Sequence, residues 1–265
     1  MSDLAIPYRV EAFNTAKSSE NRIHDDSVAR RFGFTGGLVP GVDVYAYMAH
    51  PPVARWGRAW LERGTAECRF GKPVYDGAIA EVTELPTSAG MDIRVESGGV
   101  ECATGSAALP ANAAASPDLA DWRETTPPTE RPPASPTSLA QGTWLSIRPL
   151  HLTEEFVANY LRDVRETDPL FAREKLAHPG LFPRCGNWAL SHNVVLGPWI
   201  HVGSKVQHYG VARVGETLTV RAQVTANYEH KGHLFVELDM LVLNPGPVAR
   251  IAHTAIYLPR QVANG

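Results

Sequence analysis

Cysteine is scarce in this sequence, and the three that occur form no pattern. Cys68, Cys102 and Cys185 are widely spaced and include no CxxC pair. Such usage excludes a disulfide framework and favours a reducing compartment, so we expect a cytoplasmic protein. The opening stretch MSDLAIPYRVEAFN has no apolar core flanked by basic residues, and we therefore expect no signal peptide there.

Long apolar runs and an excess of positive charge are missing as well. No stretch approaches the roughly 20 apolar residues that a membrane span needs, so we expect no membrane contact. The net charge is −3, whereas nucleic-acid binding requires a concentrated basic face. With 265 residues, 44% of them hydrophobic and 20% charged, the composition is that of a globular protein with an ample core.

Residues 110–142 differ in composition from the rest of the chain. Proline, alanine, serine and threonine dominate this stretch, and apolar periodicity disappears. A segment of this kind cannot fold alone, because it buries too little apolar surface, and it is typical of a linker. It predicts two domains, residues 1–109 and residues 143–265, separated by a Pro/Ala-rich linker.

The two halves resemble each other. GLVP at residues 37–40 corresponds to GLFP at residues 180–183, and an apolar stretch follows each. Each half reads as one strand, one apolar helix (near 42–50 and 185–195) and then several strands with alternating burial. A helix that is apolar nearly all round must be buried. The sequence therefore predicts an α+β fold in which two antiparallel sheets each wrap around a central helix.

Two smaller features of the second half add to this prediction. Lys231-Gly232 separates two strand-like runs and predicts a hairpin turn. His201 and His208 lie seven residues apart on one predicted strand, which would place them on opposite faces.

The stretch SENRIHDDSVARRFGF, residues 19–34, contains the motif with the clearest chemistry. It resembles the signature of the MaoC-like, or R-specific enoyl-CoA hydratase (hydratase 2), family. The matching residues are Asn21, Ile23, His24, Asp26, Ala29, Gly33 and Phe34. Together with the duplicated element order, this resemblance implies a double hotdog fold.

The resemblance also implies roles for individual residues. His24 would be the acid/base, Asn21 would orient the site, and Gly41, in the loop that begins at Val39, would receive the thioester oxygen. Ser19 stands where the family has its catalytic aspartate, so it can only orient water or substrate. Asp26 would assist substrate binding or tune His24 by its charge.

The second half carries a weaker copy of the same motif, RETDPLF. Glu166 falls at the aspartate position, Asp168 at the asparagine position and Phe171 at the histidine position. Each half therefore retains a different part of the acid–histidine pair. The first has the histidine without the acid, and the second has an acid without the histidine.

The implied activity is hydration or dehydration of an enoyl or 3-hydroxyacyl thioester carried by coenzyme A or acyl carrier protein. No cofactor or metal is expected, since the sequence has no nucleotide fingerprint, and His230 and His233 lack a third metal ligand. A non-catalytic ligand-binding protein and a thioesterase that uses Asp43 remain alternatives. If His24 has no catalytic role, it is a surface or capping residue just before a helix. Both a monomer and a homodimer are consistent with the duplication.

Overall fold

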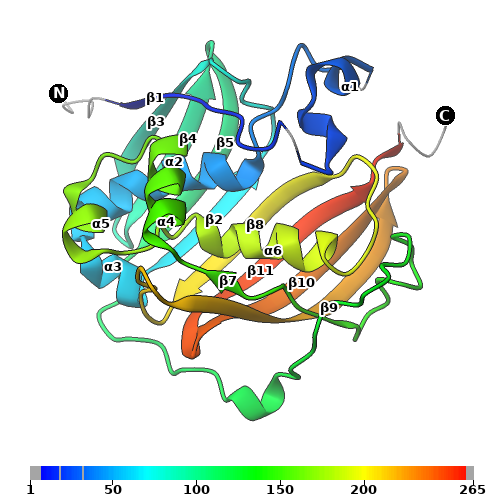
Figure 1. Ribbon diagram of the computed structural model, residues 1–265. Coiled ribbons are helices and arrows are strands. Elements are labelled where there is room, and N and C mark those ends of the chain that lie inside the picture. Colours follow the sequence, from blue (N-terminus) through cyan, green and yellow to red (C-terminus); the bar gives the residue numbers. More distant parts are fainter. Residues whose placement is uncertain (1–6, 18, 32, 261–265) are drawn as a thin grey trace.

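A computed structural model of the chain describes residues 7–17, 19–31 and 33–260. In that part of the chain, eleven strands form one sheet in the order β1-β3-β4-β5-β2-β8-β11-β10-β9-β6, and β7 pairs with β9 (Figure 1). The strands are β1 Tyr8–Glu11, β2 Thr65–Phe70, β3 Ile79–Pro86, β4 Met91–Ser97, β5 Val100–Ala108, β6 Trp144–Leu145, β7 Leu150–His151, β8 Ile200–His208, β9 Thr217–His230, β10 His233–Asn244 and β11 Gly246–Leu258. The helices are η1 Arg22–His24, α1 Asp26–Arg31, α2 Gly41–Trp56, α3 Arg58–Arg63, η2 Leu119–Asp121, α4 Glu154–Asp163, α5 Pro169–Glu174 and α6 Leu181–Ser191.

The predicted fold class is confirmed, and the two predicted sheets are continuous. Strand β2 of the first half pairs antiparallel with β8 of the second, from Thr65 opposite Gln207 to Arg69 opposite Gly203. Figure 1 shows α2 and α6 on one side of this curved sheet. Helix α6 packs against strands of its own half, whereas α2 contacts strands of the first half and also β8 of the second. The two central helices also contact each other.

Helix α2 is buried along most of its length because few of its residues are polar. The carbonyl of Pro40 accepts the N–H of Asp43 at 2.9 Å and starts the helix. Gly57, with φ 56°, ends it, in a left-handed conformation that costs glycine little. No helix among the described residues is both long and apolar enough to cross a bilayer.

The predicted turn at Lys231-Gly232 is confirmed by the hairpin between β9 and β10. Both turn residues have positive φ, 53° and 78°, as a tight two-residue hairpin turn requires. This hairpin aligns Val236 with Asn227. It also extends the sheet under α6.

Residues 110–142 form few regular elements, yet they pack against the second half. Trp122, only 9% exposed, contacts Leu241 and Leu243. The guanidinium of Arg221 donates to the carbonyl of Trp122 at 2.8 Å. Figure 1 shows this green segment running along the lower edge of the molecule. The domain boundaries at 109 and 143 stay predictions.

The expectation for His201 and His208 is wrong, and the reason is a bulge in β8. Opposite β11, Gly203 pairs with Thr254 whereas His201 pairs with Ala255, so Val202 is an extra residue. One inserted residue reverses the alternation of faces. Both histidines therefore point to the buried side, at 6% and 0% exposure.

Candidate active site

His24 ends the short helix η1 and is held at both ring nitrogens. Its Nδ1 lies 2.7 Å from the carbonyl oxygen of Leu38. Because a carbonyl only accepts, Nδ1 carries the proton and donates it, and Nε2 keeps its lone pair. Nε2 lies 3.4 Å from the side-chain nitrogen of Asn21, which donates to it. This arrangement fixes one tautomer of His24, with the proton on Nδ1 and a lone pair on Nε2.

Asn21 joins the loop before His24 to the second half of the chain. Its side-chain amide donates to the carbonyl of Trp199 at 3.0 Å, and its side-chain oxygen accepts the N–H of Trp199 at 3.3 Å. This pair of bonds holds the amide plane beside the imidazole. The orienting role expected of Asn21 is therefore geometrically available.

The loop after α1 is fixed by contacts that only glycine permits. The N–H of Gly37 donates to the carboxylate of Asp26 at 2.6 Å. A Cβ on Gly37 would lie 2.7 Å from the carbonyl oxygen of His24, so a larger residue would displace the histidine. Asn14 donates to that same carbonyl at 2.9 Å. Asp26 lines neither of the two cavities at His24, and its carboxylate instead positions the loop.

Two cavities meet at His24. The first, about 170 Å³, is mostly apolar, and the second, about 290 Å³, is polar. His24, Asn21, Pro40, Asn187 and Trp199 line both cavities. The imidazole of His24 therefore lies where the apolar cavity meets the polar one, which we call the polar vestibule.

The expected site residues divide between these two cavities. Val39 and Gly41 line the apolar cavity, where Gly41 begins α2. Ser19 lines the polar vestibule. Its hydroxyl donates to the carbonyl of Asn21 at 3.3 Å, so it supports the loop.

Glu20, beside Ser19, is held away from the imidazole. Its carboxylate accepts two hydrogen bonds from Arg131, at 2.8 and 3.2 Å, and its side chain is 71% exposed. Those hydrogen bonds lower the pKa of Glu20 despite slight burial. Glu20 therefore stays ionised at the rim of the vestibule.

Asp43, in the first turn of α2, is an acidic residue whose negative charge raises the pKa of His24. Its carboxylate is fully buried and forms an ion pair with Arg184 of α6. It also accepts the hydroxyl of Thr15 at 2.6 Å. Arg184 lines the polar vestibule. The pair therefore places a positive and a negative charge near His24, but the carboxylate of Asp43 is already bound to Arg184.

The pKa of His24 is set by competing influences. Burial is the largest of them, and it lowers the pKa below the ordinary value near 6.5. The hydrogen bond to Leu38 and the negative charge of Asp43 act in the opposite direction, while Arg184 lowers the pKa further. His24 is consequently neutral at pH 7, the state that a base needs.

The second copy of the motif builds a hydrogen-bonded cluster of one glutamate and two histidines. Glu166 is buried between His50 and His178, with oxygen–nitrogen distances of 2.8 and 3.2 Å. Burial opposes its ionisation, but hydrogen bonds from His178 and His50 hold the pKa of Glu166 below its usual value. Asp168 caps α5 by accepting the N–H of Leu170 at 2.8 Å. Glu166 therefore connects α2, through His50, with the second half of the chain.

The fold is shared with several solved structures. A MaoC-domain dehydratase from Chloroflexus aurantiacus has a TM-score of 0.58 and 12% identity, covering 96% of this chain and 95% of its own. A Mycobacterium tuberculosis protein with a double hotdog fold has a TM-score of 0.59 and 13% identity over 96% and 97% of the two chains. The dehydratase domain of a mycocerosic acid synthase-like polyketide synthase has a TM-score of 0.57 and 13% identity, covering 96% and 90%.

The chain therefore has the double hotdog fold, and the resemblance to MaoC-like proteins is confirmed at that level. No protein-family model matches the sequence, and no curated protein does. An oleoyl thioesterase from Lactobacillus plantarum has the same architecture, with a TM-score of 0.53 and 9% identity. The fold alone therefore does not select one reaction.

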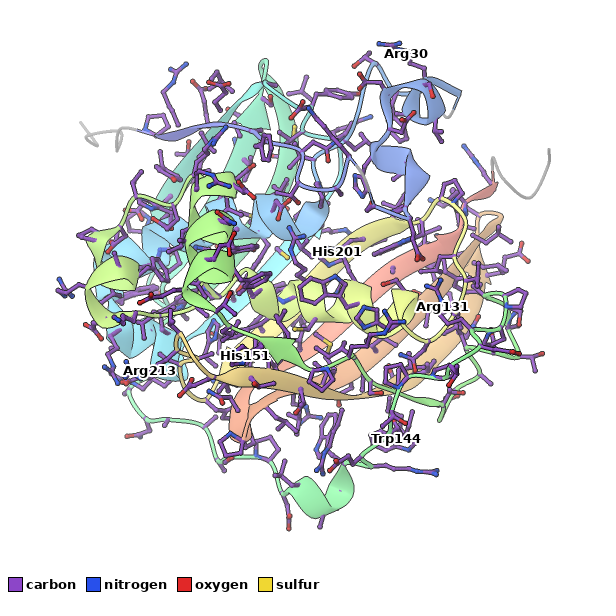
Figure 2. The ribbon with its side chains drawn as sticks, in the orientation of Figure 1. Arg30, Arg131, Trp144, His151, His201 and Arg213 are labelled. Carbon is purple, nitrogen blue, oxygen red and sulfur yellow. The ribbon has the colours of Figure 1, made fainter. Side chains whose placement is uncertain are left out.

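Two features of the site were not predicted from the sequence: the pairing of Asp43 with Arg184, and the position of His201. Asp43 and Arg184 are single charges near the starts of two largely apolar helices, and that shared feature was a signal for a pair. His201, which also lines the apolar cavity, was misplaced because the bulge in β8 is invisible in the sequence. Figure 2 shows His201 in the interior, between the helices and the sheet.

Proposed function

We propose that this protein is a hydratase or dehydratase of enoyl or 3-hydroxyacyl thioesters, with His24 as its single acid/base. The observation that carries the proposal is the hydrogen bond from His24 to the carbonyl of Leu38. It leaves a lone pair on Nε2 of a residue that lines both cavities, and the long 3.4 Å contact from the Asn21 amide would give way to a substrate proton. The fold shared with MaoC-like dehydratases supports the same reaction class.

In the dehydration direction, one imidazole performs both proton transfers. Nε2 of His24 takes the proton from C2 of a 3-hydroxyacyl thioester, and the C2–H electron pair moves toward the thioester carbonyl. The same proton is then delivered to the hydroxyl on C3 as the C3–O bond breaks, the C2–C3 double bond forms and water leaves. Hydration is the reverse sequence. A single base suffices because both transfers take place on one face of the substrate.

The negative charge that develops on the thioester oxygen needs hydrogen-bond donors. Gly41 opens α2, and the first N–H groups of a helix have no partner within it. The positive end of the helix dipole favours an anionic oxygen there. The small apolar cavity suits the acyl chain, which Val39 would contact.

The polar vestibule suits the carrier of the acyl group. Arg131, Arg148 and Arg184 line it together with His192. Glu20 offsets the charge of Arg131, and Asp43 that of Arg184. Arg148 adds a positive charge that would attract the phosphate of coenzyme A or of an acyl carrier protein.

The proposal is tested by the loss of conjugated enoyl absorbance over a series of enoyl thioesters. The variant His24→Ala should lower kcat by about 100- to 10,000-fold, the usual contribution of a positioned proton-transfer group. The matched control is His151→Ala, an exposed histidine outside both cavities, which should leave kcat unchanged. Equal rates for the wild type and His24→Ala would exclude the proposed role.

A binding protein without catalysis is the second candidate, and the position of Ser19 favours it. The Ser19 hydroxyl donates to a backbone carbonyl, so it does not take over the role of the aspartate that the resembled family has at this position. Retained binding of acyl thioesters, without turnover of any enoyl substrate, would identify this case. The thioesterase reading is weakened by the pairing of Asp43 with Arg184, and release of free thiol measures it directly.

A further inference from the structure

A buried chain of polar side chains begins in the apolar cavity and runs into the core. Nε2 of His201 lies 2.9 Å from the hydroxyl oxygen of Ser204, and that oxygen lies 3.1 Å from Nδ1 of His253. The three residues are 6%, 4% and 1% exposed. The two imidazole rings are stacked, with centroids 4.2 Å apart. Buried polar groups arranged in this way are costly to keep unless they are hydrogen-bonded.

One buried ring nitrogen in this group of side chains has no hydrogen-bond partner, and it belongs to a residue that lines the candidate site. Nδ1 of His201 is buried and accepts or donates no hydrogen bond. It lies 3.1 Å from the position that a Cβ would occupy on Gly41, so a glycine at the start of α2 is what admits the ring. His201 and Gly41 both line the apolar cavity that His24 shares.

The hydrogen-bond chain favours one tautomer of His201. Ser204 has a single hydroxyl proton, so it donates to one imidazole and accepts from the other. Nε2 of His253 is buried without a partner. A proton there would leave an N–H in the core with no acceptor. A proton on Nδ1 of His201 is also unpaired in the free protein, but His201 lines the apolar cavity, where a bound ligand can accept it. His253 therefore carries its proton on Nδ1 and donates it to Ser204.

The position of the proton on His253 determines where the protons of Ser204 and His201 lie. Ser204, having accepted from His253, donates its own proton to Nε2 of His201. His201 must then carry its proton on Nδ1, the nitrogen beside Gly41. Burial and the neighbouring His253 lower the pKa of His201 well below its ordinary value, although a backbone hydrogen bond at Gly203 acts in the opposite direction. The ring is therefore neutral and can donate one N–H.

We propose that His201 is a second catalytic residue of the site, whose Nδ1–H donates a hydrogen bond to the thioester carbonyl oxygen at the N-terminus of α2. This inference rests on the proposed function and deepens it. His24 moves the proton, while His201 and the first N–H groups of α2 stabilise the enolate oxygen. The second half of the chain thereby supplies a residue that the motif of the first half lacks. Ser204 is a positioning residue, since it acts by fixing the tautomer.

The kinetic test compares two nearly isosteric variants in the full-length protein. In His201→Asn, the side-chain nitrogen can occupy roughly the place of Nδ1 and still donate, whereas His201→Leu cannot. Loss of one such donor costs about 100- to 1,000-fold in kcat. We therefore expect that loss, with a smaller change in KM, for the leucine variant and less than about a 10-fold loss for the asparagine variant. Equal kcat values for the two folded variants would overturn the proposal.

A turnover-independent test uses saturated butyryl-CoA labelled with 13C at the thioester carbonyl. On binding to the wild type, the carbonyl resonance should move downfield, and the move should be smaller in His201→Leu, where only the N–H groups of α2 remain as donors. An unchanged shift in that variant overturns the role of His201 even when the hydratase activity is real. A downfield shift without turnover of any enoyl thioester would instead refute the proposed reaction alone. Absence of butyryl-CoA binding by the wild type overturns both.

The tautomer itself is measurable in the wild type, so the test survives a variant that fails to fold. Two-bond 1H–15N correlations of 15N-histidine-labelled protein should report His201 protonated on Nδ1. The variant Ser204→Ala should mix or reverse the tautomers, and Ser204→Thr, which keeps the hydroxyl, should restore the wild-type pattern. A wild-type His201 protonated on Nε2 would contradict the proposal.

Discussion

Asp43 on α2 and Arg184 on α6 form an ion pair that joins the two central helices and the two halves of the chain. The carboxylate is fully buried, and the arginine side chain is 15% exposed. Thr15 donates to the same carboxylate and accepts from Arg184 at 3.0 Å. Each charge therefore depends on the other for its place in the interior. The pair therefore links the two halves of the fold beside the polar vestibule, which Arg184 lines.

Removing the charge of Asp43 should destabilise the protein strongly. Asp43→Asn leaves Arg184 buried without its counter-charge, and breaking one side of a buried pair costs about 3–5 kcal/mol. Denaturant unfolding of the variant and the wild type measures the difference. The matched control is Asp239→Asn, which breaks the half-exposed pair with Arg250 and should cost under about 1 kcal/mol. Similar losses for both variants would show that burial of the Asp43 pair is not decisive.

The pH dependence of turnover should reflect the lowered pKa of His24. A base works in its neutral form, and the neutral fraction falls as the pH falls through the pKa. Because burial lowers the pKa of His24 below 6.5, the midpoint of the decline in kcat/KM should lie below pH 6.5. A plot of log kcat/KM against pH, with stability checked at each point, measures this midpoint. A midpoint above pH 6.5 would contradict the assignment.

The local part of the fold and of the site was predictable from the sequence. His24 and Asn21 come together because they are three positions apart in one short motif, and Gly41 follows from the start of a recognisable apolar helix. Periodicity and turn residues report on neighbours along the chain. The duplicated order of elements extended these local signals to the architecture.

The remaining features depend on long-range pairing. Asp43 and Arg184 are 141 residues apart, and no local pattern specifies that they meet. His201 reaches the cavity because β8 carries a bulge against β11, and a bulge is set by the partner strand. Asp26 matched the motif, yet its carboxylate went to the N–H of Gly37. A motif identifies residue types, whereas the surrounding packing decides which of them face a ligand.

The segment between the two halves should contribute to stability through Trp122. Its ring packs on Leu241 and Leu243, with the guanidinium of Arg250 5.4 Å from the ring centroid. Truncating a buried tryptophan to alanine typically costs about 3–5 kcal/mol. We expect Trp122→Ala to lose at least about 2 kcal/mol, because the site is at the surface of the sheet and can partly collapse. Its exposed neighbour is the control, and Arg123→Ala should stay within about 0.5 kcal/mol. A Trp122→Ala variant as stable as Arg123→Ala would mean that the segment is a passive tether.

Acid should destabilise the fold through its buried histidines. His208 is fully buried, with its ring 4.8 Å from Trp60 between centroids, and neither ring nitrogen has a partner. Burial lowers its pKa from 6.5 to about 3. Between those two pH values the unfolded chain binds a proton that the folded chain does not. Stability therefore rises with pH across this window, and it is lost as the pH falls from 6.5 toward 3.

Replacing that histidine should remove its share of the pH dependence. In His208→Leu, the slope of unfolding free energy against pH should decrease by up to about 1.4 kcal/mol per pH unit within the window. Above pH 7, where the histidine is neutral in both states, the difference between variant and wild type should be constant. Denaturant unfolding at a series of pH values measures both regimes. An unchanged slope below pH 6 would mean that His208 becomes protonated in the folded state, with water or a rearranged side chain reaching the ring. The same experiment on His253→Leu, whose pKa is also lowered to about 3 by burial, should remove a second share of similar size.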